Sequence, residues 1–453
     1  MIKIIIPKNN IKERIYILDV LFNEFLGLEY EFVPTDVQNY HMALPNGKQL
    51  IIEDHFFNKF PKDKEYLSIQ NLPENTSFKS NKFALEDDVV ILFGNDKLEV
   101  SENRIICGPD IFASAFFMLS RWEEYVNKSR DLHDRFPAKE SVAYKNGFLD
   151  RPIVNEYVEL LWNMLYSLDS SIERKERVYT LVLTHDVDII QKYSKLYSGT
   201  KEIGVNIFKH LNLPMSLKLT LQKIKSHFHY NYDPFNTFDY LMDLSESAGL
   251  QSHFFFQIMG ETQYDNKYDR NTKHLLKIIE NINSRGHAIG IHPSYNTYNS
   301  KKLWKEELNY LQELVDSEIT FGRQHFLRFD VPTTWQIWED MGMGWESTMS
   351  YVAKEGFRCG VCYEFPVYNI LTRKKLSLTE IPLIVMDGSF VTYQPDVSPD
   401  EMNNKINQLM DTVKKYNGEF VFLWHNSSFG YSVWENYKNV YENILKININ
   451  SVH

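Results

Sequence analysis

The sequence predicts an α/β protein in two parts: a smaller α/β domain over residues 1–166 and a barrel of parallel strands and helices over residues 175–453. Three observations support this prediction. After residue 175, short apolar runs alternate with amphipathic segments of ten to fifteen residues, which is the pattern of βαβ units. About seven such units in roughly 275 residues fit a barrel better than an open sheet. The segment 167–180 is polar and charged, and it separates the two parts.

Composition excludes several classes of protein. With 43% hydrophobic and 14% aromatic residues, the 453-residue chain is too apolar to be disordered. A net charge of −11 without a basic stripe argues against binding to nucleic acid. No segment approaches the ~18 uninterrupted apolar residues of a membrane span. The segment 1–7 lacks the long apolar core and the cleavage site of a signal peptide, so we expect a cytoplasmic protein.

Residues 1–166 show the periods of both strands and helices but no cluster of catalytic side chains. Pro45-Asn-Gly47 lies between two apolar runs and predicts a hairpin. The expected strands are 2–6, 28–33, 40–44, 49–53 and 89–93, and the expected helices are 11–25, 112–126 and 153–166. Because a charged boundary follows, we expect this domain to fold separately, with protease cleavage near 170–177 leaving two stable pieces.

The second part repeats strand and helix in alternation. The expected strands are 179–183, 251–258, 288–291, 323–329, 380–386 and 419–424, and the expected helices are 233–248, 273–285, 301–316, 333–340 and 399–416. In a barrel of parallel strands, all strand C-termini open on one face, where sites form. Polar side chains stand just after these strands: Asp186, Asp188, His292, Arg328, Asp387 and His425. Their coincidence at one face predicts a functional site there.

Thr184-His-Asp-Val-Asp188 continues the first of these strands. Strand alternation places residues 184, 186 and 188 on one side, so that the carboxylates of Asp186 and Asp188 converge. One of them must then be neutralised by a cation or shifted in pKa. This favours a metal ligand next to a general base, and the alternative is a solvated turn in which aspartate caps a helix.

His292 also stands where a strand ends, after Gly286-His-Ala-Ile-Gly-Ile291. If residues 292–296 form a helical turn, His292 and Asn296 face the same way at i, i+4. Imidazole is a good ligand for a metal such as zinc, whereas an amide oxygen is a poor one. The pattern predicts one good and one poor ligand at this position.

His425 follows the last apolar strand and has a pKa suited to a general acid, although a core histidine bonded to Asn426 is the alternative. Arg323 and Arg328 can orient a carboxylate or an anionic substrate. His325 lies between the two arginines and is either a neighbour of the site or simply buried.

The order of these motifs resembles that of the polysaccharide deacetylases, the NodB-homology or carbohydrate esterase family 4 group. That family's pattern is T-F-D-D or S-V-D-V-D, then G-H-E-I-G-x-H-x-x-x-H, R-P-P-Y and Leu-x-His. The matching segments here are Thr184–Asp188, Gly286–Asn296, Arg328–Pro332 and Leu423–His425, in the same order. The resemblance implies a distorted (β/α) barrel of about seven strands, preceded by an uncharacterised N-terminal domain that includes Phe117–Tyr125.

Carried across by position, the resemblance gives each motif residue a role. Asp186 resembles the base that activates a water molecule, and His425 resembles the acid that protonates the leaving amine. Asp188 and His292 resemble two of the three metal ligands. Arg328 resembles the arginine that orients the base, with Arg323 as the alternative.

Two positions depart from the family pattern. Asn296 stands where the family has its second histidine ligand, so the resemblance implies a weakly held divalent metal such as Zn, Co or Ni. The residue that orients His425 is not evident, and Glu346 and Asp387 are both candidates. Further candidates for the surroundings of the site are His325, Trp335 and Trp424.

The function that these patterns favour is metal-dependent hydrolysis. The expected reaction removes an N-acyl group, of which acetyl is the leading candidate, from an amino-sugar glycan or its cytoplasmic precursor. A carbohydrate is then the expected partner. The alternatives are hydrolysis of a non-sugar C–N amide and a catalytically inactive carbohydrate-binding or scaffold relative. The residue at position 296 distinguishes a metal-dependent enzyme from an inactive relative, because an inactive relative needs no metal ligand there.

Overall fold

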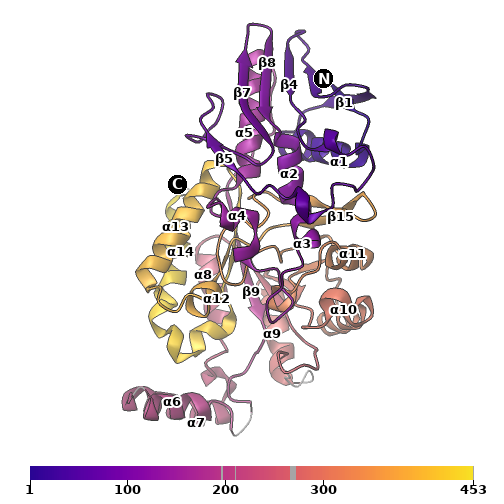
Figure 1. Ribbon diagram of the computed structural model, residues 1–453. Coiled ribbons are helices and arrows are strands. Elements are labelled where there is room, and N and C mark those ends of the chain that lie inside the picture. Colours follow the sequence, from indigo (N-terminus) through magenta and orange to yellow (C-terminus); the bar gives the residue numbers. More distant parts are fainter. Residues whose placement is uncertain (195–196, 210, 266–271, 452–453) are drawn as a thin grey trace.

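The computed structural model describes residues 1–194, 197–209, 211–265 and 272–451, and it has the two-part α/β architecture that the sequence predicts (Figure 1). One six-stranded sheet lies in the N-terminal part and one nine-stranded sheet in the C-terminal part. A small hairpin of β5 (Ser77–Lys79) and β6 (Val89–Ile91) lies beside the first sheet. The largest hydrophobic cluster contains residues of both parts.

The N-terminal sheet has the order β2-β1-β3-β4-β8-β7. Its strands are β1 (Ile2–Pro7), β2 (Tyr30–Thr35), β3 (Tyr40–Ala43), β4 (Gln49–Ile52), β7 (Gly94–Val100) and β8 (Arg104–Pro109). Helices α1 (Ile11–Leu18), α2 (Ile111–Ser120) and α5 (Ile153–Leu168) pack on it, and α2 is buried along its whole length. The hairpin β7–β8 was not predicted, because β7 is an exposed edge strand without alternation of apolar and polar residues.

The C-terminal sheet has the order β14-β15-β13-β12-β11-β10-β9-β17-β16 and is curled into an open half-barrel, which we call the barrel. Every ladder is parallel except that between β14 and β15. The strands are β9 (Thr180–Val187), β10 (Ser252–Phe256), β11 (Ala288–Ile291), β12 (Phe321–Gly322), β13 (Trp345–Glu346), β14 (Phe365–Asn369), β15 (Lys374–Glu380), β16 (Val385–Met386) and β17 (Glu419–Leu423). Parallel pairing brings the C-terminal ends of β9, β11 and β17 to one end of the barrel, as the sequence predicts.

Helices cover the outside of this barrel. They are α8 (Phe238–Ser247), α9 (Lys273–Ser284), α10 (Lys301–Val315), α11 (Thr333–Asp340), α13 (Pro399–Lys415) and α14 (Lys438–Ser451). In Figure 1, α13 and α14 lie on one side of the barrel, and α10 and α11 lie on the other. None of the helices in the described part of the chain combines the length and apolarity that crossing a membrane requires.

Two predicted strands differ from the structure. Residues 323–329 are not a strand: β12 ends at Gly322, and His325–Leu327 form a 3-10 turn in which Phe326 and Leu327 have φ of 60° and 51°. Such left-handed backbone cannot continue an extended ladder. Residues 380–386 are also interrupted, since β15 ends at Glu380 and β16 begins only at Val385.

A helical hairpin that was not predicted follows β9. It consists of α6 (Thr200–Phe208) and α7 (Leu213–Phe228) and projects from the lower end of the molecule in Figure 1. The C-terminal helix α14 was also missed.

Buried ion pairs join the two parts of the chain. Glu124, in α3 (Trp122–Val126), accepts hydrogen bonds from Arg358 Nε at 2.9 Å and from Arg121 Nε at 2.9 Å. All three side chains are at most 2% exposed. Tyr16 Oη also donates to the carbonyl oxygen of Pro366 at 2.9 Å. The N-terminal part is therefore anchored to the barrel by contacts that exclude water.

Candidate active site

Strand β9 carries the first functional side chains to the mouth of the barrel. Thr184 and Asp186 point to one side, where both lie within 3.0 Å of Arg323 Nη1. His185 points to the other side, where its Nδ1 lies 2.7 Å from the carbonyl oxygen of Trp424. The alternation predicted for Thr184–Asp188 is thus present, and His185 is a core residue.

Three potential metal ligands converge beyond the end of β9. Asp188, His292 and His325 each offer one ligand atom, and these atoms lie within 4.8 Å of one another. Asp188 Oδ1 is 3.3 Å from His292 Nε2 and 3.6 Å from His325 Nε2. It is buried and has no hydrogen-bond partner among the described residues. A buried carboxylate oxygen without a hydrogen bond, facing two imidazoles, fits the donor set of a zinc-like cation.

The outer hydrogen bonds of the two imidazoles leave Nε2 of each ring facing Asp188. His292 Nδ1 donates to the carbonyl oxygen of Arg323 at 2.6 Å. His325 Nδ1 lies 2.8 Å from Gln257 Nε2 and 3.4 Å from Asp265 Oδ1. Metal-bound histidines normally donate their other ring N–H to a carbonyl or carboxylate oxygen, and the carbonyl oxygen of Arg323 and Asp265 Oδ1 are such acceptors here. Asp265 and Gln257 were not predicted, because they lie in and beside a loop without a sequence motif.

Charge favours a cation at this cluster. Burial raises the pKa of Asp188, but His292, His325 and His425 lower it below its usual range. Burial lowers the pKa of His292, but Asp186 and Asp188 raise it above its usual value. Asp188 is therefore ionised at neutral pH. The carboxylates of Asp186 and Asp188 favour a positive charge beside them.

Arg323, and not Arg328, holds Asp186. Arg323 Nη1 donates to Asp186 Oδ1 at 2.9 Å, and Arg323 Nε donates to the carbonyl oxygen of Ser347 at 2.6 Å. Arg323 and Asp186 are both buried. The resemblance gave this role to Arg328, with Arg323 as the alternative, and the contact favours Arg323.

Arg328 instead links the barrel to the N-terminal part. Its Nε donates to the carbonyl oxygen of His133 at 2.8 Å, and its Nη2 donates to Asp134 Oδ2 at 3.1 Å. Asn296 is exposed, and its Oδ1 accepts a hydrogen bond from Arg328 Nη1 at 3.3 Å. Its amide is thus directed to Arg328, so His325 replaces Asn296 as the third ligand in our interpretation. Residues 292–296 do not form the expected helical turn, since the first 3-10 turn starts at Thr297.

His425 is oriented by Asp387. His425 Nδ1 lies 2.7 Å from Asp387 Oδ1, while the other carboxylate oxygen accepts from Ser428 Oγ at 2.6 Å. His425 Nε2 then faces the cluster, 3.9 Å from Asp188 Oδ2. Of the two candidates for this orienting role, Asp387 has the contact.

Glu346 lies in a separate buried pair with Glu380. Trp335 Nε1 donates to Glu346 Oε1 at 2.9 Å and to Glu380 Oε2 at 3.1 Å. Burial and the neighbouring carboxylate raise the pKa of Glu380 well above its usual value. Neither Glu346 nor Trp335 lines the cavity at the cluster, and Trp424 packs in the core with Phe422 and Tyr441.

The cavity above the cluster has a volume of about 200 Å³. Asp186, Asp188, His292, His325 and His425 line its polar side. Leu327, Val352 and Met386 line the apolar side, and Arg135 and Tyr393 stand at its rim. Arg135 belongs to the N-terminal part, and its Nη1 donates to the carbonyl oxygen of Phe326 at 3.1 Å. A polar cluster faced by an apolar wall suits a small acyl group beside a reacting amide.

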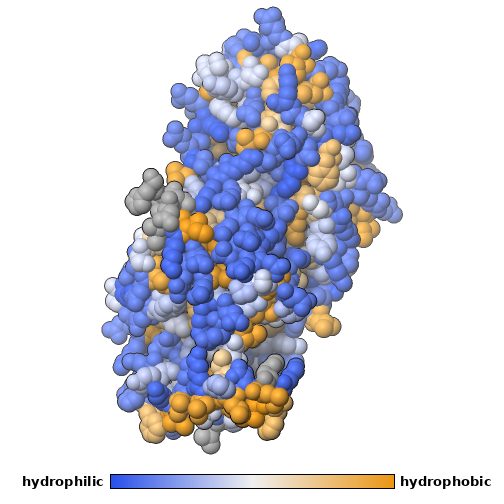
Figure 2. All heavy atoms as spheres, turned by 90° about the vertical axis from the view of Figure 1, so that its left-hand side faces the viewer, coloured by the Kyte–Doolittle hydropathy of each residue, from blue (hydrophilic) through white to orange (hydrophobic). Residues whose placement is uncertain are grey.

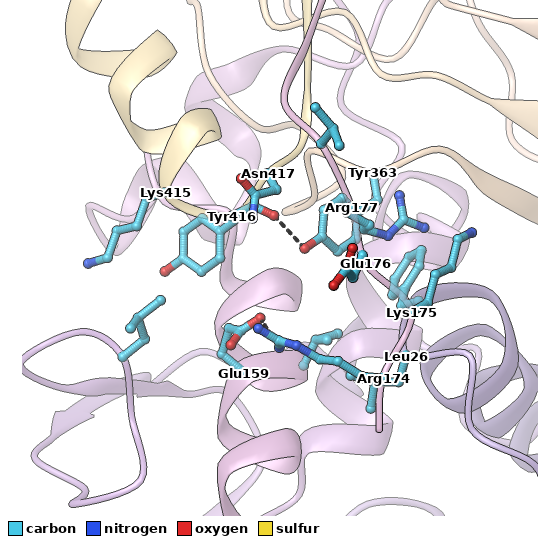
Figure 3. A pocket seen from close by; sticks show the side chains of 14 residues that line it. Leu26, Glu159, Arg174, Lys175, Glu176, Arg177, Tyr363, Lys415, Tyr416 and Asn417 are labelled. Carbon is cyan, nitrogen blue, oxygen red and sulfur yellow. Dashed lines mark hydrogen bonds and ion pairs between the residues drawn. The ribbon is translucent and has the colours of Figure 1, made fainter. Parts of the chain in front are cut away.

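A second cavity lies at the seam between the two parts, beside the segment that leads into the start of β9. Figure 3 shows it between α5, the segment 174–178 and the end of α13. Its volume is about 450 Å³. Three of its cations are paired with carboxylates: Arg174 with Glu159, Arg177 with Glu364, and Lys415 with Glu86. It shares no lining residue with the cavity at the cluster.

Close contact between β11 and β12 fixes the spacing of the site. A side chain at Gly322 would place its Cβ 1.9 Å from the carbonyl oxygen of Ile291. That same oxygen accepts a hydrogen bond from the N–H of Arg323 at 3.1 Å. Glycine is therefore required at this position, directly before the arginine that holds Asp186.

Comparison with known proteins gives two kinds of match. Residues 2–170 match a family of unknown function, DUF7033, which agrees with the uncharacterised N-terminal domain that the sequence suggests. No curated protein matches the chain.

Solved structures are also similar to the chain. A candidate polysaccharide deacetylase from Mycobacterium smegmatis has 14% identity over 60% of this chain and 85% of its own, with a TM-score of 0.39. A protein described in the same way from Pseudomonas aeruginosa PAO1 has 10% identity over 60% and 85%, with a TM-score of 0.37. A CE4 family pseudoenzyme from Bacillus anthracis has 11% identity over 60% and 61%, with a TM-score of 0.30. The chain is thus similar to polysaccharide deacetylases in these comparisons, and its N-terminal 2–170 match a family without assigned function.

Proposed function

We propose that the protein is a metal-dependent hydrolase that removes an N-acyl group, in the first place acetyl, from an amino sugar. The observation that carries this proposal is the convergence of Asp188, His292 and His325 beside Asp186 and His425 at the end of the barrel. One carboxylate and two imidazoles suit a divalent cation, and a carboxylate and an imidazole remain for proton transfer.

Asp188, His292 and His325 would hold the cation. A bound Zn²⁺, Co²⁺ or Ni²⁺ would polarise the scissile carbonyl and lower the pKa of water. His292 Nδ1 donates to the carbonyl oxygen of Arg323, which leaves Nε2 of His292 available. Asp265 Oδ1 lies 3.4 Å from His325 Nδ1 and is the acceptor that would leave Nε2 of His325 available. The orphaned Oδ1 of Asp188 supplies the third donor.

Asp186 and His425 divide the proton transfers. Asp186, held by Arg323, accepts a proton from the water that attacks the acyl carbonyl carbon. His425, held by Asp387, donates the proton at Nε2 to the sugar nitrogen as the C–N bond breaks. The products are a carboxylic acid and a free amine. The substrate that we propose is a glycan or its cytoplasmic lipid-linked or nucleotide-linked precursor.

The test is a comparison of metal binding and amine release in single variants of the purified full-length protein. We expect Asp188→Asn, His292→Ala and His325→Ala to lose both metal and activity, and Asp186→Asn to lose turnover while it keeps metal. Asn296→Ala is the matched control and should keep both. The measurements are isothermal titration with Zn²⁺ or Co²⁺ and an amine-release assay on N-acetylated sugar nucleotides and chito-oligosaccharides.

Each outcome of this test bears on one assignment. Metal loss in Asn296→Ala but not in His325→Ala would restore Asn296 as the ligand. Equal metal loss in Asp186→Asn would reverse the roles of Asp186 and Asp188. Absence of metal binding and of amine release in the wild type would identify a non-catalytic relative and overturn the proposal.

A further inference from the structure

The hairpin α6–α7 turns an apolar face to solvent instead of burying it. On α7, Leu213, Leu217, Leu221, Ile224 and Phe228 are 66, 61, 49, 53 and 73% exposed. Steps of three and four residues place them in one stripe along the helix. Phe208 and Leu211, where α6 gives way to α7, are 84 and 80% exposed. Figure 2 shows hydrophobic side chains gathered at the lower end of the molecule, where α6 and α7 lie in Figure 1.

This arrangement reverses the usual polarity of a surface helix. A helix on a globular protein normally buries its apolar stripe and exposes its polar face. The side of α7 that is buried carries Ser216, Leu219 and Ser226 instead. The apolar stripe is therefore not needed to hold the hairpin on the barrel.

The charge of the hairpin is opposite to that of the rest of the protein. Residues 203–232 contain no aspartate or glutamate, although the whole chain has a net charge of −11. The lysines of this segment are Lys209, Lys218, Lys223 and Lys225. Within the described ranges, Lys218 forms an ion pair with Glu435, and no ion pair to a carboxylate is found for the other three. The apolar stripe is thus flanked by unneutralised positive charge.

We propose that α6–α7 binds the surface of a lipid bilayer that contains anionic lipids. Leucine, isoleucine and phenylalanine on one face, with lysines beside them, are the features of a helix that lies in the membrane interface. The apolar side chains enter the boundary of the acyl chains while the lysines contact lipid phosphates. A second copy of the chain is a poorer partner, because pairing the two stripes would bring two sets of lysines together.

The position of the hairpin in the chain places this surface at the catalytic end. The hairpin follows β9, whose C-terminal end carries Asp186 and Asp188. A groove of about 720 Å³ between the hairpin and the barrel is lined by Ile189, Val205, Met215 and Tyr431, among others. Ile189 is the neighbour of Asp188. If the proposed function holds, the membrane-binding hairpin lies on the segment that directly follows the site, and an amino sugar on a lipid carrier is the substrate class that fits.

Vesicle flotation of the full-length protein tests this proposal. We expect wild-type protein to float with vesicles of phosphatidylcholine and phosphatidylglycerol, and to bind pure phosphatidylcholine more than about tenfold more weakly. The double variant Leu217→Glu/Leu221→Glu should lose binding to both. Lys223→Glu/Lys225→Glu should weaken binding to the anionic vesicles alone. Ile69→Glu is the matched control, because Ile69 is 54% exposed but lies in the N-terminal part.

Circular dichroism and amine release from a soluble N-acetylated substrate are measured on the same variants. The circular dichroism spectrum should be unchanged in Leu217→Glu/Leu221→Glu, because both leucines are exposed. Amine release should also be unchanged, because neither residue lines the catalytic cavity. If neither the wild type nor the variants release amine, the result counts against the proposed function and not against membrane binding. Wild-type protein that fails to float, or Leu217→Glu/Leu221→Glu that still floats, would overturn the membrane proposal. So would a concentration-dependent dimer in sedimentation that Leu221→Glu abolishes, without vesicle binding.

Discussion

Arg323 links Asp186, which we propose as the general base, to neighbouring segments of the barrel. Its guanidinium donates to Asp186 and Thr184 on β9 and to both the carbonyl and the hydroxyl oxygen of Ser347. Arginine can make these bonds at once because its fork of donors is planar and rigid. Lysine has one ammonium group and cannot reach all of them.

We therefore predict that Arg323→Lys lowers kcat by about 100-fold, because Asp186 loses its fixed position. Metal affinity should stay unchanged, since Arg323 contacts the ligand His292 through its backbone oxygen alone. Steady-state kinetics and metal titration measure the two effects. Arg328→Lys is the control and should keep kcat near wild type, so a larger loss in Arg328→Lys would contradict the assignment.

The pKa of His425 depends on Asp387. Burial lowers this pKa, but the carboxylate of Asp387, followed by Asp188 and Asp186, raises it to about 10. A general acid must be protonated, so activity falls as pH rises through its pKa. We predict that Asp387→Asn lowers the pKa of His425 and moves the alkaline limb of the kcat profile to lower pH.

The profile of kcat against pH in wild type and Asp387→Asn checks this prediction. Ser428→Ala is the matched control, because it removes another partner of Asp387 but keeps the negative charge. An alkaline limb that stays in place in Asp387→Asn would show that His425 is not the acid.

At the scale of elements, α3 is joined to the barrel by one buried carboxylate. Burial raises the pKa of Glu124, but Arg358 and Arg121 lower it to about 2. Because this pKa is depressed below its usual value in the folded state, the ionised carboxylate stabilises the fold above about pH 4, and this contribution is lost as the pH falls toward 2.

We predict that Glu124→Gln lowers the free energy of unfolding by about 3–5 kcal/mol, because the buried guanidinium of Arg358 loses its carboxylate partner and that of Arg121 keeps only Glu123. Denaturant unfolding at neutral pH measures this loss. Glu123→Gln is the control: burial raises the pKa of Glu123 to about 7, so at neutral pH this side chain is only partly ionised, and a neutral amide should cost less there. Equal losses in the two variants would contradict the prediction.

Sequence patterns were informative where an element combines a strong period with local end signals. The strands β9, β11 and β17 and the helices α9, α10, α11 and α13 lie within a few residues of their predicted places. The short strands β12 and β13 could not be predicted, since two residues show no period. The same holds for the exposed hairpin β7–β8.

The site residues also divide into those that the sequence predicted and those that it did not. Asp186, Asp188, His292 and His425 come together because strand ends in a parallel barrel share one face. His325 was undervalued although a signal was present, since it lies two residues after Arg323 and so belonged to the same side of the expected strand. Asn296 was considered as a ligand because it stands at the family's second histidine position and would face His292 in a helical turn. Pro293 follows His292 and disfavours helical backbone there.

At the scale of the whole molecule, the boundary between the two parts is exposed, but the interface is not. Residues 173–176 are exposed, whereas Arg121, Glu124 and Arg358 are buried between the parts. The separate folding of residues 1–166 stays a prediction, and the continuous hydrophobic cluster bears on how the pieces behave after cleavage.

We predict that limited proteolysis cuts within 170–177 and that the two fragments still elute together in gel filtration under native conditions. The reason is that apolar surface and ion pairs buried between the parts are not released by one backbone cut. Glu124→Gln should weaken the association after the same cut. Two folded fragments that separate freely in the wild type would show that the parts are independent.

The segment 127–137 crosses from the N-terminal part to the mouth of the barrel, where His133 and Asp134 bind Arg328 and Arg135 stands at the cavity rim. The segment 127–137 therefore limits how the gene can evolve. A recombination event that exchanged the first part for an unrelated one would also remove Arg135, a residue that lines the pocket, so the two parts of the gene are constrained to change together. A homologue without the N-terminal part would need loops of the barrel itself to form this side of the pocket before it could again bind a substrate selectively.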